Sequence, residues 1–158
     1  MSTVRPYMGA NGFANMTLNF ETIRDDFALL DDWEDKYRYL IDLGRDLAPY
    51  PEQHRDAEHK VQGCASQVWL ATRASDGADP VLNFDGDSDA HIVRGLVAVM
   101  IALMSGQTAS QILASDPEAS FRTLGLDTHL SLQRANGLRS MVARMKAEAS
   151  KYRDGFQV

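Results

Sequence analysis

The segment IVRGLVAVMIALM, residues 92–104, limits the possible folds of this chain more than any other. Apart from Arg94 and Gly95 it consists of apolar side chains. A helix that is apolar on nearly every side is typical of the centre of a globular domain, with other elements packed around it. Its longest uninterrupted apolar run, Leu96 to Met104, has nine residues, whereas a membrane-spanning helix needs about 20. The segment therefore predicts a buried central helix.

Residues with strong positional preferences mark the ends of this helix and of those that follow it. Ser88 is expected to cap the N-terminus of the central helix, and Gly106 is expected to end it. Thr108 and Gln111 match a capping box, which predicts a short helix directly after them. The dipeptide Asp-Pro at 116–117 predicts the start of another, because proline is favoured at the first helical position.

Three further helices are expected from the spacing of apolar residues. A short one covers Thr22 to Leu30. The next begins at Asp32, a favourable N-cap, and is stopped by Pro49 and Pro51. A long final helix runs from about Ser131 to Arg153, with its apolar residues along one stripe.

Between residues 61 and 86 the apolar pattern changes from helical to extended. Short strands are expected at Val61, over Gln67 to Arg73 and over Val81 to Gly86. The connections between them are short, which favours antiparallel pairing. With helices before and after these strands, the sequence predicts an α+β domain, in which helices pack on one face of a three-stranded antiparallel sheet.

Length and charge narrow the classes of function. The 158 residues fit one domain, which we expect over residues 20–158 behind a flexible N-terminal tail, residues 1–19. A net charge of -6 gives no general attraction to nucleic acid or to anionic membranes, so neither is expected as a partner. One cysteine cannot form an internal disulfide, and the N-terminal region has no apolar block typical of a secretory signal. We therefore expect a cytoplasmic protein.

That cysteine, Cys64, lies in the segment QGCASQ. A lone cysteine is most often a small buried side chain without chemistry. Here its neighbours are small or polar, and Gln62, Gly63, Ser66 and Gln67 are expected to shape a loop between two extended segments. A sulfur near the tip of such a loop can be reached by another large molecule. This context favours chemistry that is performed together with a protein partner.

Two other kinds of cysteine chemistry remain open. A thiol hydrolase needs a histidine beside the sulfur, and the four histidines stand in no recognisable signature: His54, His59, His91 and His129. A cluster-scaffold or zinc site needs several thiolates or clustered histidines, and none has that spacing, so no metal site is predicted. The segment DGDSD at residues 85–89 is expected to form a turn and a helix start rather than a calcium loop.

Four segments in order resemble the SufE family of cysteine desulfuration proteins. The most specific is VQGCASQVWL, because a GC-x-S-x-VW signature contains the sulfur-accepting cysteine of that family. The others are WEDKYRYLIDLGRDL, GDSDAHIVRGLVAVM and HLSLQRANGLRSM. The resemblance spans about residues 20–150 and implies the fold shared by SufE and the iron-sulfur scaffold IscU.

The resemblance implies sulfur relay. Cys64 would take the outer sulfur of a persulfide on a SufS-type cysteine desulfurase, stimulate that enzyme, and pass the sulfur to a SufBCD-type scaffold. The chain would then be an accessory protein with a covalent persulfide intermediate and no cofactor, because pyridoxal phosphate belongs to the desulfurase. The CsdE branch, which serves a different desulfurase, is equally compatible, and we expect a monomer or weak homodimer. Scaffolds of this fold hold clusters with three cysteines, so a single cysteine argues against cluster assembly on this chain.

The matching segments also imply residues for docking to the desulfurase: Asp87, Asp89 and Arg134. The alternative role of the two aspartates is capping of the central helix, and that of the arginine is an ordinary surface charge. Several relatives have proline just before this arginine, whereas this chain has Leu132-Gln133-Arg134, so the final helix is expected to begin less rigidly. We also expect Cys64 to be sheltered between transfers and to swing outward on docking.

Overall fold

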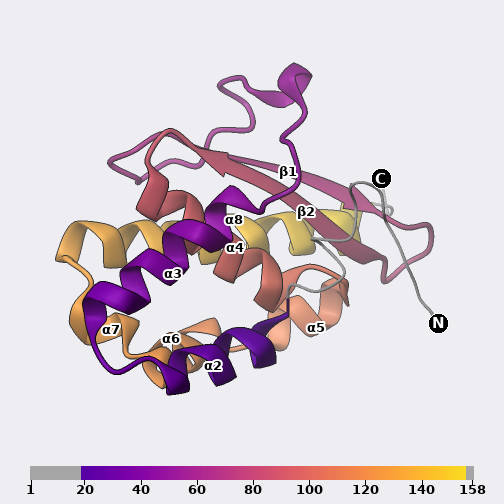
Figure 1. Cartoon of the computed structure of the whole chain (residues 1–158). Helices are drawn as coiled ribbons and strands as arrows, with labels where there is room; N and C mark the ends of the chain where they lie inside the picture. Colours follow the sequence, from indigo (N-terminus) through magenta and orange to yellow (C-terminus); the bar gives the residue numbers. More distant parts are fainter. Residues whose placement is uncertain (1–18, 156–158) are drawn as a thin grey trace.

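The computed structural model describes residues 19–155, so the expected tail lies outside the described residues except for Asn19. The helices are α2 (Phe20–Leu29), α3 (Trp33–Arg45), α4 (His91–Met104), α5 (Ala109–Ala114), α6 (Pro117–Leu124), α7 (Leu126–His129) and α8 (Leu132–Gly155). The strands are β1 (Val68–Ala74), β2 (Val81–Ser88) and β3 (Gln107–Thr108), and a 3-10 turn, η1, covers Glu52–His54. The helices lie mainly on one side of the sheet (Figure 1), which confirms the predicted α+β architecture.

The sheet has the order β1-β2-β3, and both pairings are antiparallel. β1 pairs along its whole length with β2, from Val68 opposite Ser88 to Ala74 opposite Leu82. Along β2 every second residue is buried, because one face packs on the helices. Leu82 and Phe84 are on that face, at 0% and 3% exposure. The alternation of buried and more exposed residues along β2 thus matches the alternation of residue types that predicted this strand.

The third strand was predicted in the wrong place. It is β3, whose two residues pair with Val81 and Leu82, and not the segment at Val61. β3 is too short to show a period of its own, and Thr108 also belongs to the capping box of α5 that the sequence predicts. The segment at Val61 makes only an isolated bridge, between Lys60 and Trp69.

The central helix is α4, and eight of its 14 residues are buried. Its predicted cap is wrong: the N-cap is Ala90, which makes no side-chain capping bond. Ser88 instead ends β2, because the extended backbone continues that far, and its hydroxyl accepts the N–H of Ala90 at 3.2 Å. α3 crosses α4 closely, since a Cβ on Gly44 would lie 2.8 Å from the backbone nitrogen of Gly95. This close approach holds α3 against α4.

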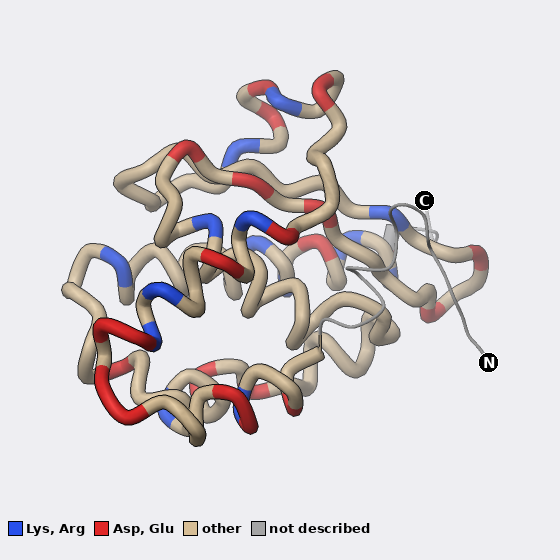
Figure 2. The backbone as a smooth tube through the Cα atoms, viewed as in Figure 1, with Lys and Arg blue, Asp and Glu red and all other residues tan. Residues whose placement is uncertain are grey.

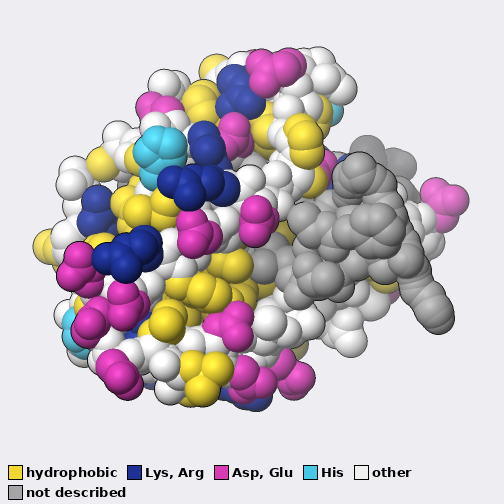
Figure 3. Space-filling view, viewed as in Figure 1, with side chains coloured by type: hydrophobic (Ala, Val, Ile, Leu, Met, Phe, Trp, Pro, Cys, Tyr) yellow, Lys and Arg dark blue, Asp and Glu magenta, His cyan; other side chains and the backbone are white. Residues whose placement is uncertain are grey.

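Acidic and basic residues are interspersed along α2 and α3 (Figure 2), and charged side chains of both signs lie on this face of the molecule (Figure 3). Several form short pairs along one helix, such as Arg38 with Glu34 and Asp35, each at 3.1 Å. Such exposed pairs contribute at most about 1 kcal/mol. None of the helices in residues 19–155 is both long and apolar enough to span a bilayer.

Candidate functional site

Cys64 lies in a loop whose two ends are joined by a backbone hydrogen bond. The N–H of Val61 donates to the carbonyl of Val68 at 2.8 Å, so residues 62–67 form a hairpin-like turn leading into β1. The sequence predicts this turn correctly. The sulfur does not project from the tip, however. It is half-buried and turned inward, with Sγ 3.7 Å from the carbonyl oxygen of Gly137 in α8.

Gly63 lets this loop lie directly on α8. Its φ is +89°, in the left-handed region that side-chain-bearing residues rarely adopt. A Cβ at this position would also overlap the hydroxyl of Ser140 in α8. Both observations explain the glycine before Cys64: the turn needs the backbone conformation and the missing side chain.

Asp89 ties the other end of the loop to the start of α4. Its Oδ1 accepts the backbone N–H of Gln67 at 3.0 Å, and its Oδ2 lies 3.4 Å from the side-chain amide of the same residue. The N–H of Asp89 donates back to the carbonyl of Gln67 at 3.3 Å. Asp89 therefore holds the loop and does not cap α4, which was the alternative role considered for it. Gln62, by contrast, is exposed.

A cavity of about 250 Å³ lies beneath the Cys64 loop. The loop, the first half of α4 and the N-terminal part of α8 line it, with the residues Cys64, Ala65, Ser66, Val93, Leu96, Ser131, Gln133, Arg134, Gly137 and Met141. The structure thus brings Ser66 and Arg134, two of the predicted residues, to the same cavity as the sulfur. Sequence reasoning missed the apolar walls, Val93, Leu96 and Met141, because such side chains are indistinguishable from ordinary core.

Burial raises the pKa of the Cys64 thiol, because the thiolate loses solvation there. The resting sulfur is accordingly a neutral S–H, which can donate to the carbonyl of Gly137. A neutral thiol is a poor nucleophile. In this position the sulfur is sheltered and weakly nucleophilic.

Asp87 lies outside the cavity, in a cluster that joins three elements. Its carboxylate accepts from Arg55 Nη1 at 2.9 Å and from Arg94 Nε at 2.8 Å, and 19% of its side chain is exposed. The guanidinium of Arg55 also lies 4.9 Å from the ring of Trp69. Asp87 thereby connects the segment before the Cys64 loop with β2 and α4. It does not cap α4 either.

No histidine lines the cavity among the described residues. The rings of His54 and His59 contact each other at a tilt of 31°, with centroids 4.4 Å apart, and His59 Nδ1 lies 2.7 Å from Asp56. His129 stacks on Trp33, with ring centroids 4.0 Å apart. None of the four histidines therefore lines the cavity of the sulfur as the general base that a thiol hydrolase would need. Within residues 19–155, no group of three or more His, Cys, Asp or Glu side chains is placed to hold a metal ion.

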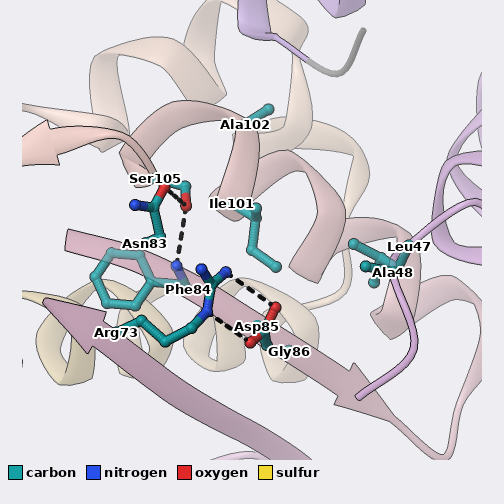
Figure 4. A pocket seen from close by; sticks show the side chains of 10 residues that line it. All are labelled: Leu47, Ala48, Arg73, Asn83, Phe84, Asp85, Gly86, Ile101, Ala102 and Ser105. Carbon is teal, nitrogen blue, oxygen red and sulfur yellow. Dashed lines mark hydrogen bonds and ion pairs between the residues drawn. The ribbon is translucent and has the colours of Figure 1, made fainter. Parts of the chain in front are cut away.

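A second cavity, of about 160 Å³, lies between β2 and the C-terminal end of α4 (Figure 4). Its polar groups are paired with one another: Arg73 Nε lies 3.1 Å from Asp85, and the hydroxyl of Ser105 accepts the N–H of Phe84 at 2.9 Å. The described residues that line it include neither a thiol nor a histidine.

Comparisons with known proteins agree with the resemblance noted from the sequence. The family model described as "SufE: Fe-S metabolism associated domain" matches residues 21–149. An uncharacterized SufE-like protein of Rhizobium meliloti (strain 1021) is 58% identical over 132 residues, which are 83% of this chain and 94% of the relative. The sulfur acceptor protein CsdE of Escherichia coli (strain K12) is 40% identical over 125 residues, 79% of this chain and 84% of the relative.

A solved structure has the same fold. The solution structure of a hypothetical protein from Thermus thermophilus matches with a TM-score of 0.64 and 17% identity, covering 84% of this chain and 94% of that one. At that identity the match supports the architecture alone.

Proposed function

Because the chain belongs to the SufE family, we propose that it is a sulfur acceptor and carrier in iron-sulfur cluster assembly. The observation that supports this most directly is the placement of its single thiol. Cys64 is on a short turn over a cavity, where a sulfur atom can be stored and then presented. The E. coli relative named a sulfur acceptor protein supports the same role.

In the proposed transfer, the Cys64 thiolate attacks the outer sulfur of a persulfide on a cysteine desulfurase. A new S–S bond forms on Cys64, the S–S bond of the desulfurase persulfide breaks, and the desulfurase cysteine leaves as a thiolate. Cys64 then bears the persulfide. Pyridoxal phosphate takes part only in the desulfurase, which generates its persulfide from free cysteine.

Since burial raises the pKa of the Cys64 thiol, the attacking thiolate forms when docking turns the sulfur out of its cavity. Positioning against the donor then supplies much of the rate. After transfer, return of the loop would enclose the persulfide between α4 and α8 and shield it from other thiols. This movement is the sheltering and outward swing expected from the sequence.

The docking face we propose surrounds the mouth of the cavity. Arg134 lines the cavity, and Leu132, two residues earlier in α8, has 76% of its surface exposed. Asp87 and Asp89 are occupied by contacts within the chain, so a docking role for them would require those contacts to be exchanged. We propose a SufS-type desulfurase, or its counterpart in the CsdE branch, as donor, and a SufBCD-type scaffold as the cytoplasmic acceptor.

Mass spectrometry of the intact protein tests this proposal. After incubation with a cysteine desulfurase and free cysteine, the protein should gain the mass of one sulfur atom, and Cys64→Ser should gain none. The gain should be lost on treatment with a thiol reductant. Hydrolysis of esters without a partner would support a thiol hydrolase instead, and stoichiometric iron or zinc in the purified protein would support a cluster scaffold.

A further inference from the structure

Arg144 in α8 holds the segment that leads into the Cys64 loop. Its Nη1 donates to the carbonyl of Lys60 at 3.0 Å, and its Nη2 donates to the carbonyl of Glu58 at 2.9 Å. Its Nε faces Glu148 at 3.3 Å, and 23% of the Arg144 side chain is exposed. One guanidinium thus bonds two backbone carbonyls of the same short segment, with charge-assisted hydrogen bonds at both.

The segment held by Arg144 is the first arm of the hairpin-like turn. His59 accepts the N–H of Leu70 at 2.8 Å through its carbonyl, and Val61 donates to Val68. These pairings let residues 58–61 lie along the outer edge of β1. If the carbonyls of Glu58 and Lys60 lost their partner, this arm would be held only by the strand pairing and by the buried side chain of Val61.

The contacts of α8 with the Cys64 region follow one helical stripe. Arg134, Gly137, Met141 and Arg144 are spaced by three or four residues and so share a face. The first three line the cavity, and Arg144 continues the face beyond it. The loop is therefore seated on α8 at its sulfur and clamped to α8 at its stem.

We propose that Arg144 is a positioning residue for sulfur transfer: by clamping residues 58–60 to α8, it keeps Cys64 withdrawn over the cavity until a partner docks. A role of the Arg144 clamp in sulfur transfer rests on the proposed function, whereas the effect of Arg144 on the exposure of Cys64 does not. Loss of the clamp should expose the thiol even when no desulfurase is present.

A matched control exists on the same helix. Lys146 also donates to two backbone carbonyls, of Ser115 at 2.7 Å and of Leu113 at 3.5 Å, but these lie at the end of α5. Arg144→Met and Lys146→Met therefore each remove one α8 cation from a pair of carbonyls. Only Arg144→Met affects the Cys64 arm.

The test measures the rate of Cys64 alkylation by iodoacetamide in the full chain at one pH, beside the unfolding temperature of each variant. Arg144→Met should raise the rate by at least about tenfold, since it removes two charge-assisted hydrogen bonds and the loss of even one shifts a local opening equilibrium by roughly that factor. Lys146→Met should change it less than about twofold, and Arg144→Lys should be intermediate because lysine keeps a charged donor.

Hydrogen exchange provides the second measurement. In Arg144→Met the amides of Val61 and Leu70 should exchange faster, while that of Phe84 in β2 should not. Equal acceleration of alkylation by both methionine variants, or no acceleration by either, would overturn the proposal. If neither the wild type nor any variant accepted sulfur from a desulfurase, the proposed function would be contradicted. The alkylation and hydrogen-exchange results would still decide whether Arg144 holds Cys64 in place.

Discussion

The sulfur of Cys64 faces the backbone carbonyl of Gly137 at 3.7 Å. A Cβ on residue 137 would lie 3.8 Å from the sulfur, which is an ordinary van der Waals distance. This contact suits a neutral thiol, whose proton the carbonyl can accept. It does not suit a thiolate, which would place negative charge against the carbonyl oxygen.

The pH dependence of Cys64 alkylation should reflect this environment. Because burial raises the pKa of the Cys64 thiol, the alkylation rate should follow a pKa above that of an unstructured cysteine, about 8.5. The native state then binds this proton more tightly than the unfolded chain does. Its contribution to stability is complete below pH of about 8.5 and is lost as pH rises through the native pKa.

Urea unfolding of the wild type and of Cys64→Ser, measured from below pH of about 8.5 to above it, tests how this proton changes the free energy of unfolding. The wild-type free energy of unfolding should fall more steeply with rising pH than that of the variant. Parallel curves, or an alkylation profile centred below the free-cysteine value, would contradict the sheltered thiol.

Gly63→Ala should destabilise the loop through two separate causes. Its φ of +89° costs an alanine about 1 kcal/mol, and the added Cβ must displace Ser140. Gly77→Ala is the matched control, since its φ is +112° and nothing lies within 4 Å of an added Cβ. We expect a loss of about 3 kcal/mol for the first variant and about 1 kcal/mol for the second, measured by urea unfolding. Equal losses would show that the loop does not press on α8.

Leu132→Asp should impair sulfur transfer without harming the fold. Leu132 is the first residue of α8 and is 76% exposed beside the cavity, and an acidic residue in a first helical turn is favourable. Loss of an apolar docking contact should lower the efficiency of transfer from the desulfurase about tenfold. Leu29→Asp, at a position 81% exposed on α2, is the control and should leave transfer unchanged. Equal behaviour of the two variants would place docking elsewhere.

Asp87→Ala should lower the free energy of unfolding by about 2 kcal/mol, because it leaves the guanidiniums of Arg55 and Arg94 without their shared carboxylate. Adding Arg55→Met removes one of the two cations that lose this carboxylate, the one that keeps Glu52 as a partner at 2.8 Å. The double variant should therefore lose less than the sum of the two single losses. A double-mutant cycle by urea unfolding measures this coupling, and strictly additive losses would mean that the cluster contributes no coupled stability.

The sequence predicts the helices well because their signals are local. Asp32 does cap α3 and Pro117 does begin α6, since a cap or a first-turn proline acts through its immediate neighbours. The short helix α7 and the two-residue β3 were not predicted, because neither is long enough to show a period. Ser88 was misassigned as a cap because pairing with Val68, distant in sequence, extends β2 through it.

For the candidate site, the sequence indicates the reactive residue and little of its surroundings. Cys64 stands out by its small and polar neighbours. Arg144, by contrast, is one cation among several on a long helix, and its partners are backbone carbonyls far away in the chain, at separations of 84 and 86 positions. Contacts to main-chain atoms leave no trace in side-chain types, so only the structure shows them.

The bond between Val61 and Val68 also sets how far the sulfur can travel. While it holds, Cys64 is three residues from a fixed point, and an extended chain of that length reaches about 10 Å. In the proposed transfer, a donor whose persulfide lies no deeper than about 10 Å below its surface could be reached by this turn without other changes. A more deeply recessed donor would have to separate β1 from its neighbouring arm, so the size of this turn defines which enzymes can load it.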